Sequence, residues 1–547
     1  MTWASPQLMR RSSPRSTACH ARRARRTRAH VARSHPRCSV PPRPRSTVAP
    51  RPSTLHGRST PVHAPRSLHA RPRSTIAPRP SASAEPIPGP AMARAPGSSI
   101  PQGPIAYPLW IPILWNGRHE VDEQGADVAL IKGSERATLA QAALYFADEK
   151  AEATGAFNLA VRVEVRGRIA AAELAAACRR LVAATPALRV RMGIDAWTGE
   201  IVYGFSDDEP EIEMLAEPVD DAETFIAART MRPFEVDDGP LVRFLVLPVA
   251  PGHTTVVLIV HHLVYDWISH RLLAEQLSMS ITGAVTPASP DEYVRLVRRV
   301  RAAEESALTE DRDYWYDRIP PSAMVAPFPR EGASDTVLRR IITADPAAAA
   351  GISACAGSVG ISVFKLVSAA VHHALPVPDS GVTALGAAAS QRLAGEAAVV
   401  GCFINEVPLP ASREAGETVV DLARREHARW SDDLRRRHYS FADLAAHVRR
   451  GGGAVEALNQ VMISYRSQQQ SVERAFAGVT CTAELDVPNY AAKTPLSVRF
   501  FEDGGGLGCE VQWSGHLSAR SGERYTQCLA ESLAQCAGTA VRIEEAS

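Results

Sequence analysis

The sequence predicts a mixed α/β (α+β) fold, and three patterns support this prediction. Residues 156–167 (AFNLAVRVEVRG) alternate apolar and polar side chains, as a half-buried strand does. Residues 169–185 then place apolar side chains on one helical face, and Pro186 ends that helix. Two further apolar strands are joined by a Pro-Gly turn, the second of them at 254–260. Strands and helices mixed in this order indicate sheets covered by helices.

The first hundred residues differ in composition from the rest of the chain. They hold 19 arginines and a single acidic residue, Glu85, whereas the remainder has 42 basic and 58 acidic side chains. A segment rich in Arg, Pro and Ser with few large apolar groups cannot bury a core, so residues 1–103 are predicted to be a disordered arm. The alternative is a translation start downstream, with Met92 as a candidate, which would leave residues 1–91 out of the product. Nucleic-acid binding is disfavoured because no aromatic side chain lies among the arginines between Arg10 and Arg94, and no folded partner accompanies them.

Two globular lobes are expected after the arm, because 547 residues exceed one ordinary domain. Residues 104–320 form the predicted N-terminal lobe, which ends at the adjacent prolines 320 and 321. Residues 321–547 repeat the mixed pattern of helices and strands and form the predicted C-terminal lobe.

Nine cysteines are present, an odd number without a C-x-x-C pair, which favours neither a zinc site nor a disulfide framework. No metal is expected. The apolar run at 347–364 is diluted by Gly and Ser and is interpreted as a packed helical region, not a membrane span. These features predict a cytoplasmic protein without a membrane partner.

The stretch IVHHLVYDWIS (259–269) carries the strongest signal for function. His261 and His262 end a predicted strand, so their rings face opposite sides, and a neutral imidazole can accept a proton near pH 7. Asp266 precedes an amphipathic helical pattern. From these residues alone, two interpretations stay open: a catalytic histidine, or two packed histidines with Asp266 as a helix cap.

Further segments of the chain, from about residue 135 to the C-terminus, resemble the condensation domains of nonribosomal peptide synthetases, in the chloramphenicol acetyltransferase-like acyltransferase superfamily. The H-H-x-x-x-D spacing is the first of these resemblances. The others occur in the family's order: TLAQAALYF (138–146), TPALRVRM (185–192), DYWYDRI (313–319), Arg392 with VGCFINEVPLP (400–410), which is similar to V-G-x-F-V-N-T-x-P, and HYSFADL (438–444).

This resemblance implies two chloramphenicol-acetyltransferase-like lobes in a V-shaped pseudo-dimer, with His262 facing a channel between them. It implies that Asp266 pairs with Arg189 to hold the active-site loop and that His261 packs behind the strand. Channel-lining candidates are Tyr265, Trp267 and Asn405. Trp267 stands where the family has glycine, so it narrows the channel or marks a silent site.

The implied function is free-standing acyl transfer in specialised metabolism, giving an amide or an ester. No bound cofactor is expected. The acyl donor would be a phosphopantetheine thioester on a carrier protein acting in trans, or coenzyme A, and the acceptor a small amine or alcohol. His262 would act as a general base or would orient the nucleophile and stabilise the tetrahedral intermediate. A monomer is expected. The alternatives are a catalytically silent module that recruits a partner to a carrier-bound intermediate, or an epimerisation-type relative.

Overall fold

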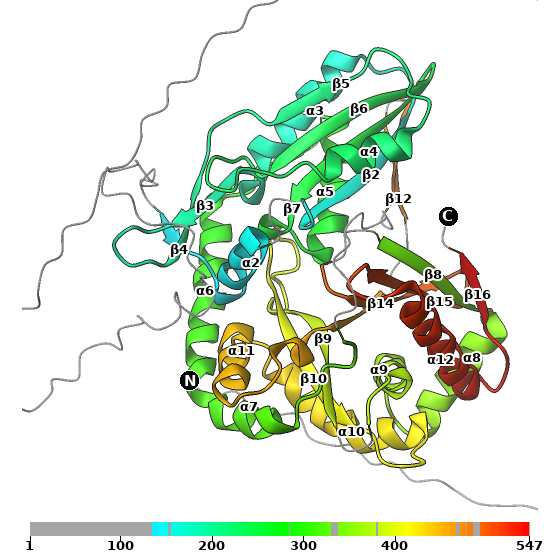
Figure 1. Cartoon of the computed structure of the whole chain (residues 1–547). Coiled ribbons are helices and arrows are strands. Elements are labelled where there is room, and N and C mark those ends of the chain that lie inside the picture. Colours follow the sequence, from blue (N-terminus) through cyan, green and yellow to red (C-terminus); the bar gives the residue numbers. More distant parts are fainter. Residues whose placement is uncertain are drawn as a thin grey trace, which may run out of the picture. The chain divides into compact units, whose positions relative to one another are not determined.

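Two large β-sheets and one small sheet organise the chain in this computed structural model (Figure 1). The structure describes residues 134–150, 155–283, 285–329, 337–378, 381–466, 471–476, 478–484 and 493–545. All of them belong to one unit. The predicted arm at 1–103 lies outside the described residues, so its disorder and the alternative start at Met92 stay predictions.

The six-stranded sheet has the order β12-β13-β2-β7-β6-β5. Its strands are β2 (Asn158–Arg166), β5 (Glu211–Met214), β6 (Val242–Ala250), β7 (His253–His261), β12 (Ser471–Phe476) and β13 (Val479–Glu484). Val161, Val163 and Val165 point from β2 into a core that includes side chains of α3 (Ala171–Ala184) and α5 (Trp267–Ile281). The alternation in the sequence is therefore a half-buried strand, and the predicted mixed α/β class is confirmed.

The seven-stranded sheet has the order β10-β9-β11-β14-β15-β8-β16. Its strands are β8 (Val337–Ala344), β9 (Val382–Ser390), β10 (Ile404–Ser412), β11 (Val461–Arg466), β14 (Leu496–Asp503), β15 (Gly506–Ser514) and β16 (Arg542–Glu545). Strand β11 runs parallel to both of its neighbours, whereas the other pairs are antiparallel.

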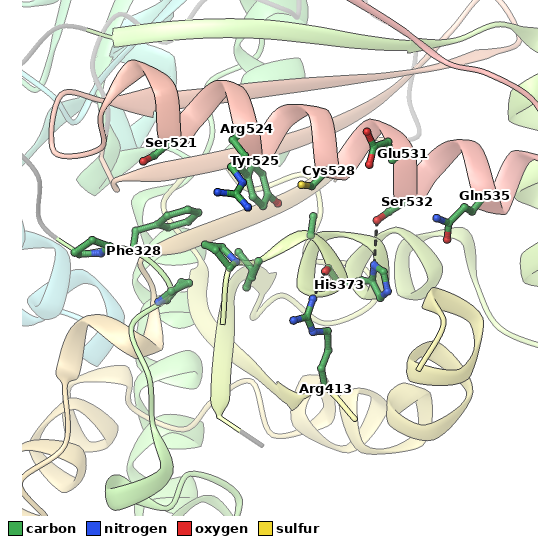
Figure 2. A pocket seen from close by; sticks show the side chains of 15 residues that line it. Phe328, His373, Arg413, Ser521, Arg524, Tyr525, Cys528, Glu531, Ser532 and Gln535 are labelled. Carbon is green, nitrogen blue, oxygen red and sulfur yellow. Dashed lines mark hydrogen bonds between the residues drawn. The ribbon is translucent and has the colours of Figure 1, made fainter. Parts of the chain in front are cut away.

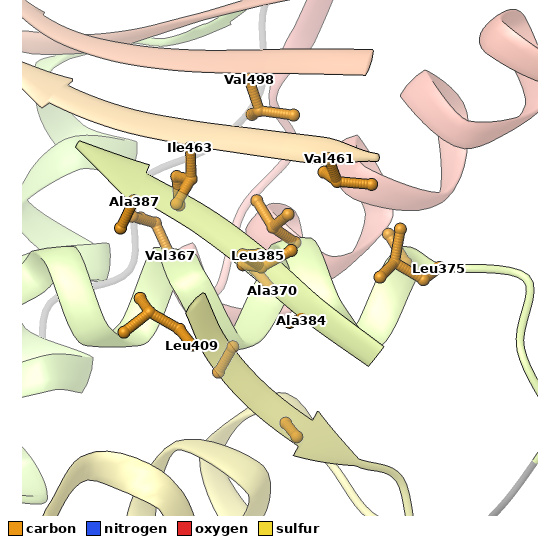
Figure 3. Packing of buried hydrophobic residues seen from close by; sticks show 14 of the residues in the cluster. Val367, Ala370, Leu375, Ala384, Leu385, Ala387, Leu409, Val461, Ile463 and Val498 are labelled. Atoms are coloured by element: carbon orange, nitrogen blue, oxygen red, sulfur yellow. The ribbon is translucent and has the colours of Figure 1, made fainter. Parts of the chain in front are cut away.

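Helices pack on one face of this second sheet. They are α8 (Pro346–Ser358), α9 (Val363–Ala374), α10 (Val419–Arg435) and α12 (Ala519–Ala537). Figure 3 shows Val367 and Ala370 of α9 packed against Leu385 of β9, with Leu409 of β10 and Val461 of β11 close by. Because side chains alternate along a strand, the residues between these buried ones face away from the helices.

The remaining elements connect the two large sheets. The small sheet has the order β1-β4-β3, with β1 (Glu135–Arg136), β4 (Ile201–Phe205) and β3 (Val190–Ile194). The other helices are α2 (Leu139–Lys150), α4 (Ala222–Thr230), α6 (Pro290–Glu310), α7 (Arg312–Arg318) and α11 (Phe441–Arg450). Short 3₁₀ turns are η1 (Pro186–Arg189), η2 (His262–Val264), η3 (Pro321–Ala323) and η4 (Val455–Leu458).

One hairpin departs from the predicted division of the chain at residue 321. Strands β12 and β13 follow that point in the sequence, yet β13 pairs with β2 and extends the six-stranded sheet. The register aligns Cys481 with Val165, and both side chains enter the core of the first half. Hydrogen bonding to an open strand edge, which no local pattern records, places this hairpin.

No single helix among the described ranges is long and apolar enough to cross a bilayer. Helices α8 and α9 pass that test only as a pair bent by 99°. Ala348, Ile352 and Ala356 of α8 contribute to the hydrophobic core, as the interpretation of 347–364 as a packed helical region predicts.

Candidate active site

His262 lies where strand β7 turns into helix α5. Strand pairing ends at His261, and the amide of His262 donates to the carbonyl of Phe157 at 2.8 Å. The ring Nδ1 of His262 is 2.7 Å from the carbonyl oxygen of Tyr265. A carbonyl only accepts, so Nδ1 carries the proton and Nε2 is left with a lone pair. No residue in the part of the chain that the structure describes hydrogen-bonds to Nε2, so the ring is oriented with its basic lone pair available.

The protonation state of His262 also suits a base. Burial, and next the positive charge of Lys493, lower its pKa from 6.5 to about 3. His261 also lowers the pKa of His262, because a charge on both neighbouring rings would be repulsive. The ring is therefore neutral at pH 7. It is not protonated by the solvent at this pH, but it can accept a proton from a reacting group.

His261 points to the other side of the strand end, as the alternation predicts. It is buried, its Nδ1 accepts from the amide of Leu263 at 3.2 Å, and its Nε2 lies 3.3 Å from Oδ2 of Asp148. The ring of Phe234 packs edge-on against it at 6.1 Å. This is the position that a supporting role requires.

Asp266 holds the loop to the second half of the chain. Its Oδ1 caps helix α5 by accepting from the amide and hydroxyl of Ser269, each at 2.9 Å. Its Oδ2 accepts from the amide of Phe403 at 3.0 Å and from the guanidinium of Arg392. The ion pair is fully buried, with 0% exposure for the Asp266 side chain and 2% for Arg392. The Asp266 carboxylate thus caps helix α5 with one oxygen and pairs with Arg392 through the other.

The predicted pairing of Asp266 with Arg189 is wrong. Arg189 ends turn η1 beside the small sheet, and its side chain donates to the carbonyl of Ser206 at 3.1 Å and pairs with Asp207. Asp207 is 94% exposed, so this is a surface ion pair. Arg392 satisfies Asp266 instead because the segment 399–403 lies against helix α5. There Arg392 also donates to the carbonyls of Val399 and Gly401, at 2.9 and 3.0 Å.

Gly401 allows this close approach. Its amide donates to the hydroxyl of Ser269 at 2.9 Å, and its carbonyl oxygen lies 2.8 Å from the same hydroxyl. A Cβ at this position would lie 2.3 Å from the ring of Phe403 and 2.9 Å from that of Tyr293. Only glycine fits between these rings while the backbone contacts the helix.

The family model described as "Condensation domain" matches residues 133–543. The chain belongs to the condensation-domain family. Fumosorinone synthetase from Cordyceps fumosorosea is 25% identical over 68% of this chain, but the match spans 9% of that synthetase. This condensation domain thus corresponds to a small part of its curated relative.

Solved structures share the fold. The complex of the X-domain and OxyB from teicoplanin biosynthesis contains a chain with a TM-score of 0.63 and 17% identity, covering 74% of this chain and 94% of that one. The starter condensation domain of rhizomide synthetase, a mutant in complex with C8-CoA, has a TM-score of 0.61 and 17% identity, covering 76% and 98%.

Of the three predicted channel residues in this condensation domain, Tyr265 contacts His262, and Trp267 begins helix α5 five residues after it. The hydroxyl of Tyr265 bonds to the ring of His270, while its carbonyl orients His262. The ring of Trp267 lies 5.0 Å from that of His270, and the guanidinium of Arg466 stacks 3.7 Å from the Trp267 centroid. A cation over an indole face is an attractive contact, so Trp267 has a partner where the family has glycine.

The side chain of Asn405, the third predicted channel residue, is hydrogen-bonded on the face of β10 that packs in the core. Its amide nitrogen donates to the carbonyls of Arg437 and Tyr439, at 2.8 and 2.6 Å, and the side chain is buried. It ties β10 to the segment between α10 and α11, so the prediction that it lines a channel is wrong. Its face of β10 is that of Val407 and Leu409, which pack in the core.

Two residues near His262 were missed from the sequence. The Sγ atom of Cys402 is 4.0 Å from Nδ1 of His262, and Lys493 is electrostatically coupled to both. Burial lowers the pKa of Lys493 to about 7, and its Nζ lies 5.7 Å from the Phe157 ring centroid. The motif VGCFINEVPLP was the available signal for Cys402, whereas no local pattern near Lys493 indicated the site.

A separate pocket of about 520 Å³ lies between helices α9 and α12, on the helical side of the second sheet (Figure 2). His373, Arg413, Tyr525 and Glu531 are among its lining residues. It contains none of the predicted site residues, so the chemistry considered below is that around His262.

Proposed function

We propose that this chain transfers an acyl or peptidyl group from a thioester to an amine or hydroxyl acceptor. The thioester would be on the phosphopantetheine arm of a separate carrier protein or on coenzyme A. The observation that supports this most directly is the tautomer of His262: Nδ1–H is committed to the Tyr265 carbonyl, and Nε2 is free on a neutral ring.

In the proposed reaction, Nε2 accepts the proton of the nucleophile as the nitrogen or oxygen bonds to the thioester carbonyl carbon. The tetrahedral intermediate then collapses, the carbon–sulfur bond breaks, and the imidazolium returns the proton to the leaving thiolate. Cys402 is unsuited to form an acyl-enzyme, because burial raises the pKa of its thiol to about 12 and Nδ1 of His262 already donates elsewhere. Direct transfer fits these groups.

Purified full-length chain is the material for the test. It would be incubated with acyl-coenzyme A and acyl-carrier thioesters and with panels of amines and alcohols. Mass spectrometry of the products and colorimetric detection of released thiol measure transfer. The proposal expects an amide or ester product together with one equivalent of thiol. Thioester hydrolysis alone across the panel would contradict it.

The pH dependence of transfer is a further prediction. Because the pKa of His262 lies near 3 rather than 6.5, kcat/KM should stay level as the pH falls from 8 to about 5. Lys493→Met removes the nearby positive charge, so the pKa of His262 should rise and the acid limb should move to higher pH. Lys365→Met is the matched control, since Lys365 lies on α9 and bonds to Ser431. Because the pKa of Lys493 is itself about 7, the decisive result is a limb at pH 6.5 that stays at the same pH in Lys493→Met, which would contradict the assignment.

The alternative is a catalytically silent domain that recruits a partner. Two observations favour it: the stack of Arg466 on Trp267 beside His262, and a similar fold in the complex of the X-domain and OxyB. Trp267→Gly separates the two functions. If the site is active, the unaltered protein transfers acyl groups and the variant accepts bulkier acceptors, because a large ring has been removed. Transfer by the variant alone would support the silent alternative.

A further inference from the structure

Strand β10 presents one acidic side chain toward the side of the sheet that holds His262. Val407 and Leu409 lie in the core under the helices, so Ile404 and Glu406 face the other way. Cys402, two residues before the strand begins, has its Sγ atom 4.0 Å from Nδ1 of His262, so the start of β10 is close to the site. At ~3.3 Å per residue, Glu406 is roughly 13 Å along the chain from Cys402.

The carboxyl group of Glu406 is incompletely satisfied. Its Oε1 is shielded from solvent and has no hydrogen-bond partner, the one such carboxylate oxygen in the described ranges. No described residue forms an ion pair with it, and among the described residues the side chain of Asn459 is its one hydrogen-bonding neighbour. Other buried carboxylates differ: Asp433 pairs with Arg318, and Glu304 accepts from two amides of α2 and from Gln391.

A glycine on the neighbouring strand lets this unsatisfied oxygen approach the backbone. A Cβ on Gly386 would lie 2.6 Å from Oε1 of Glu406 and 2.3 Å from Sδ of Met462. The carboxyl group and the Met462 thioether therefore pack against β9 where a larger residue would displace them. Glu406 also stands where the family motif V-G-x-F-V-N-T-x-P has threonine. An acceptor oxygen shielded from water without a partner is destabilising, and a bound donor would offset that cost.

We propose that Glu406 binds a protonated amine carried by the acyl donor or by the acceptor. This amine is distinct from the nucleophile, which must be uncharged and must reach His262. Desolvation raises the pKa of Glu406 to about 8, and an ammonium group would lower it again by pairing with the carboxylate. The inference rests on the proposed acyl transfer, and it narrows the substrates to those with a second, basic nitrogen.

Matched substrates test this preference and identify its source. The donor pair is 8-aminooctanoyl-coenzyme A and nonanoyl-coenzyme A, and the acceptor pair is 1,6-diaminohexane and 6-aminohexan-1-ol. In one pair, kcat/KM should be at least about tenfold higher for the member with the additional amine, the size expected for a charged hydrogen bond. Glu406→Gln and Glu406→Thr should abolish that ratio. Glu510→Gln is the control, because Glu510 on β15 already pairs with Arg499.

Two results would overturn the inference: equal kcat/KM for both members of each pair in the unaltered protein, or a ratio that survives Glu406→Gln. If no substrate pair is transferred, the proposed function fails, and calorimetry with 1,6-diaminohexane decides the inference separately. The diamine should then bind the unaltered protein at least tenfold more tightly than Glu406→Gln, with hexane-1,6-diol as the uncharged control. Equal affinities for the two proteins would overturn it.

Discussion

His262→Ala should reduce the rate of acyl transfer by about 10²–10⁴, the usual effect of losing one general base. The melting temperature should change little. Among the described residues, the ring hydrogen-bonds to the Tyr265 carbonyl at 2.7 Å and contacts Sγ of Cys402 at 4.0 Å, so its removal breaks few interactions. Thiol release from the best thioester, with and without acceptor, measures the rate. Thermal unfolding of the same samples separates chemistry from folding.

His261→Ala is the control for this experiment. Its ring is buried and contacts Leu263, Asp148 and Phe234, so its removal should mainly lower the melting temperature. Transfer per folded molecule should stay within a few-fold of the unaltered protein. If His262→Ala transferred acyl groups at the unaltered rate, Nε2 of His262 would not be the base and the silent alternative would replace the proposal.

Breaking the Asp266–Arg392 pair should have the largest effect on stability. Arg392→Met leaves the Asp266 carboxylate buried without its cation, which typically costs about 3–5 kcal/mol in the free energy of unfolding. Asp266→Ala should cost a similar amount, because Arg392 is left among carbonyl groups and the cap of α5 is lost as well. Urea unfolding followed by fluorescence measures both variants.

Arg189→Met provides the comparison. Its partner Asp207 is exposed, so the change should cost only about 0–1 kcal/mol. The double variant Asp266→Asn with Arg392→Met should be less unstable than the sum of the single changes, because neither buried charge remains without its partner. A loss for Arg189→Met as large as that for Arg392→Met would mean that Arg189, not Arg392, supports the loop in solution.

The sequence by itself determined most of the local structure. Alternation over 156–167 and the apolar run at 254–260 correspond to β2 and β7, and the pattern after Asp266 corresponds to helix α5. These predictions succeeded because a period of two or of 3.6 residues reflects which side chains are buried within one element. The opposite directions of His261 and His262 follow from the same rule, since both lie at the end of a strand.

Only the tertiary structure decided which distant groups meet. Arg392 is 126 residues from Asp266, and it reaches that carboxylate because the segment around Gly401 packs on helix α5. Cys402 and Lys493 approach His262, and β13 joins β2, through contacts of the same long range. Periodicity records burial and not the identity of a partner. Asp266 therefore pairs with Arg392 and not with Arg189, because the fold brings the Arg392 guanidinium to this buried carboxylate. Arg189 instead forms a surface ion pair with Asp207.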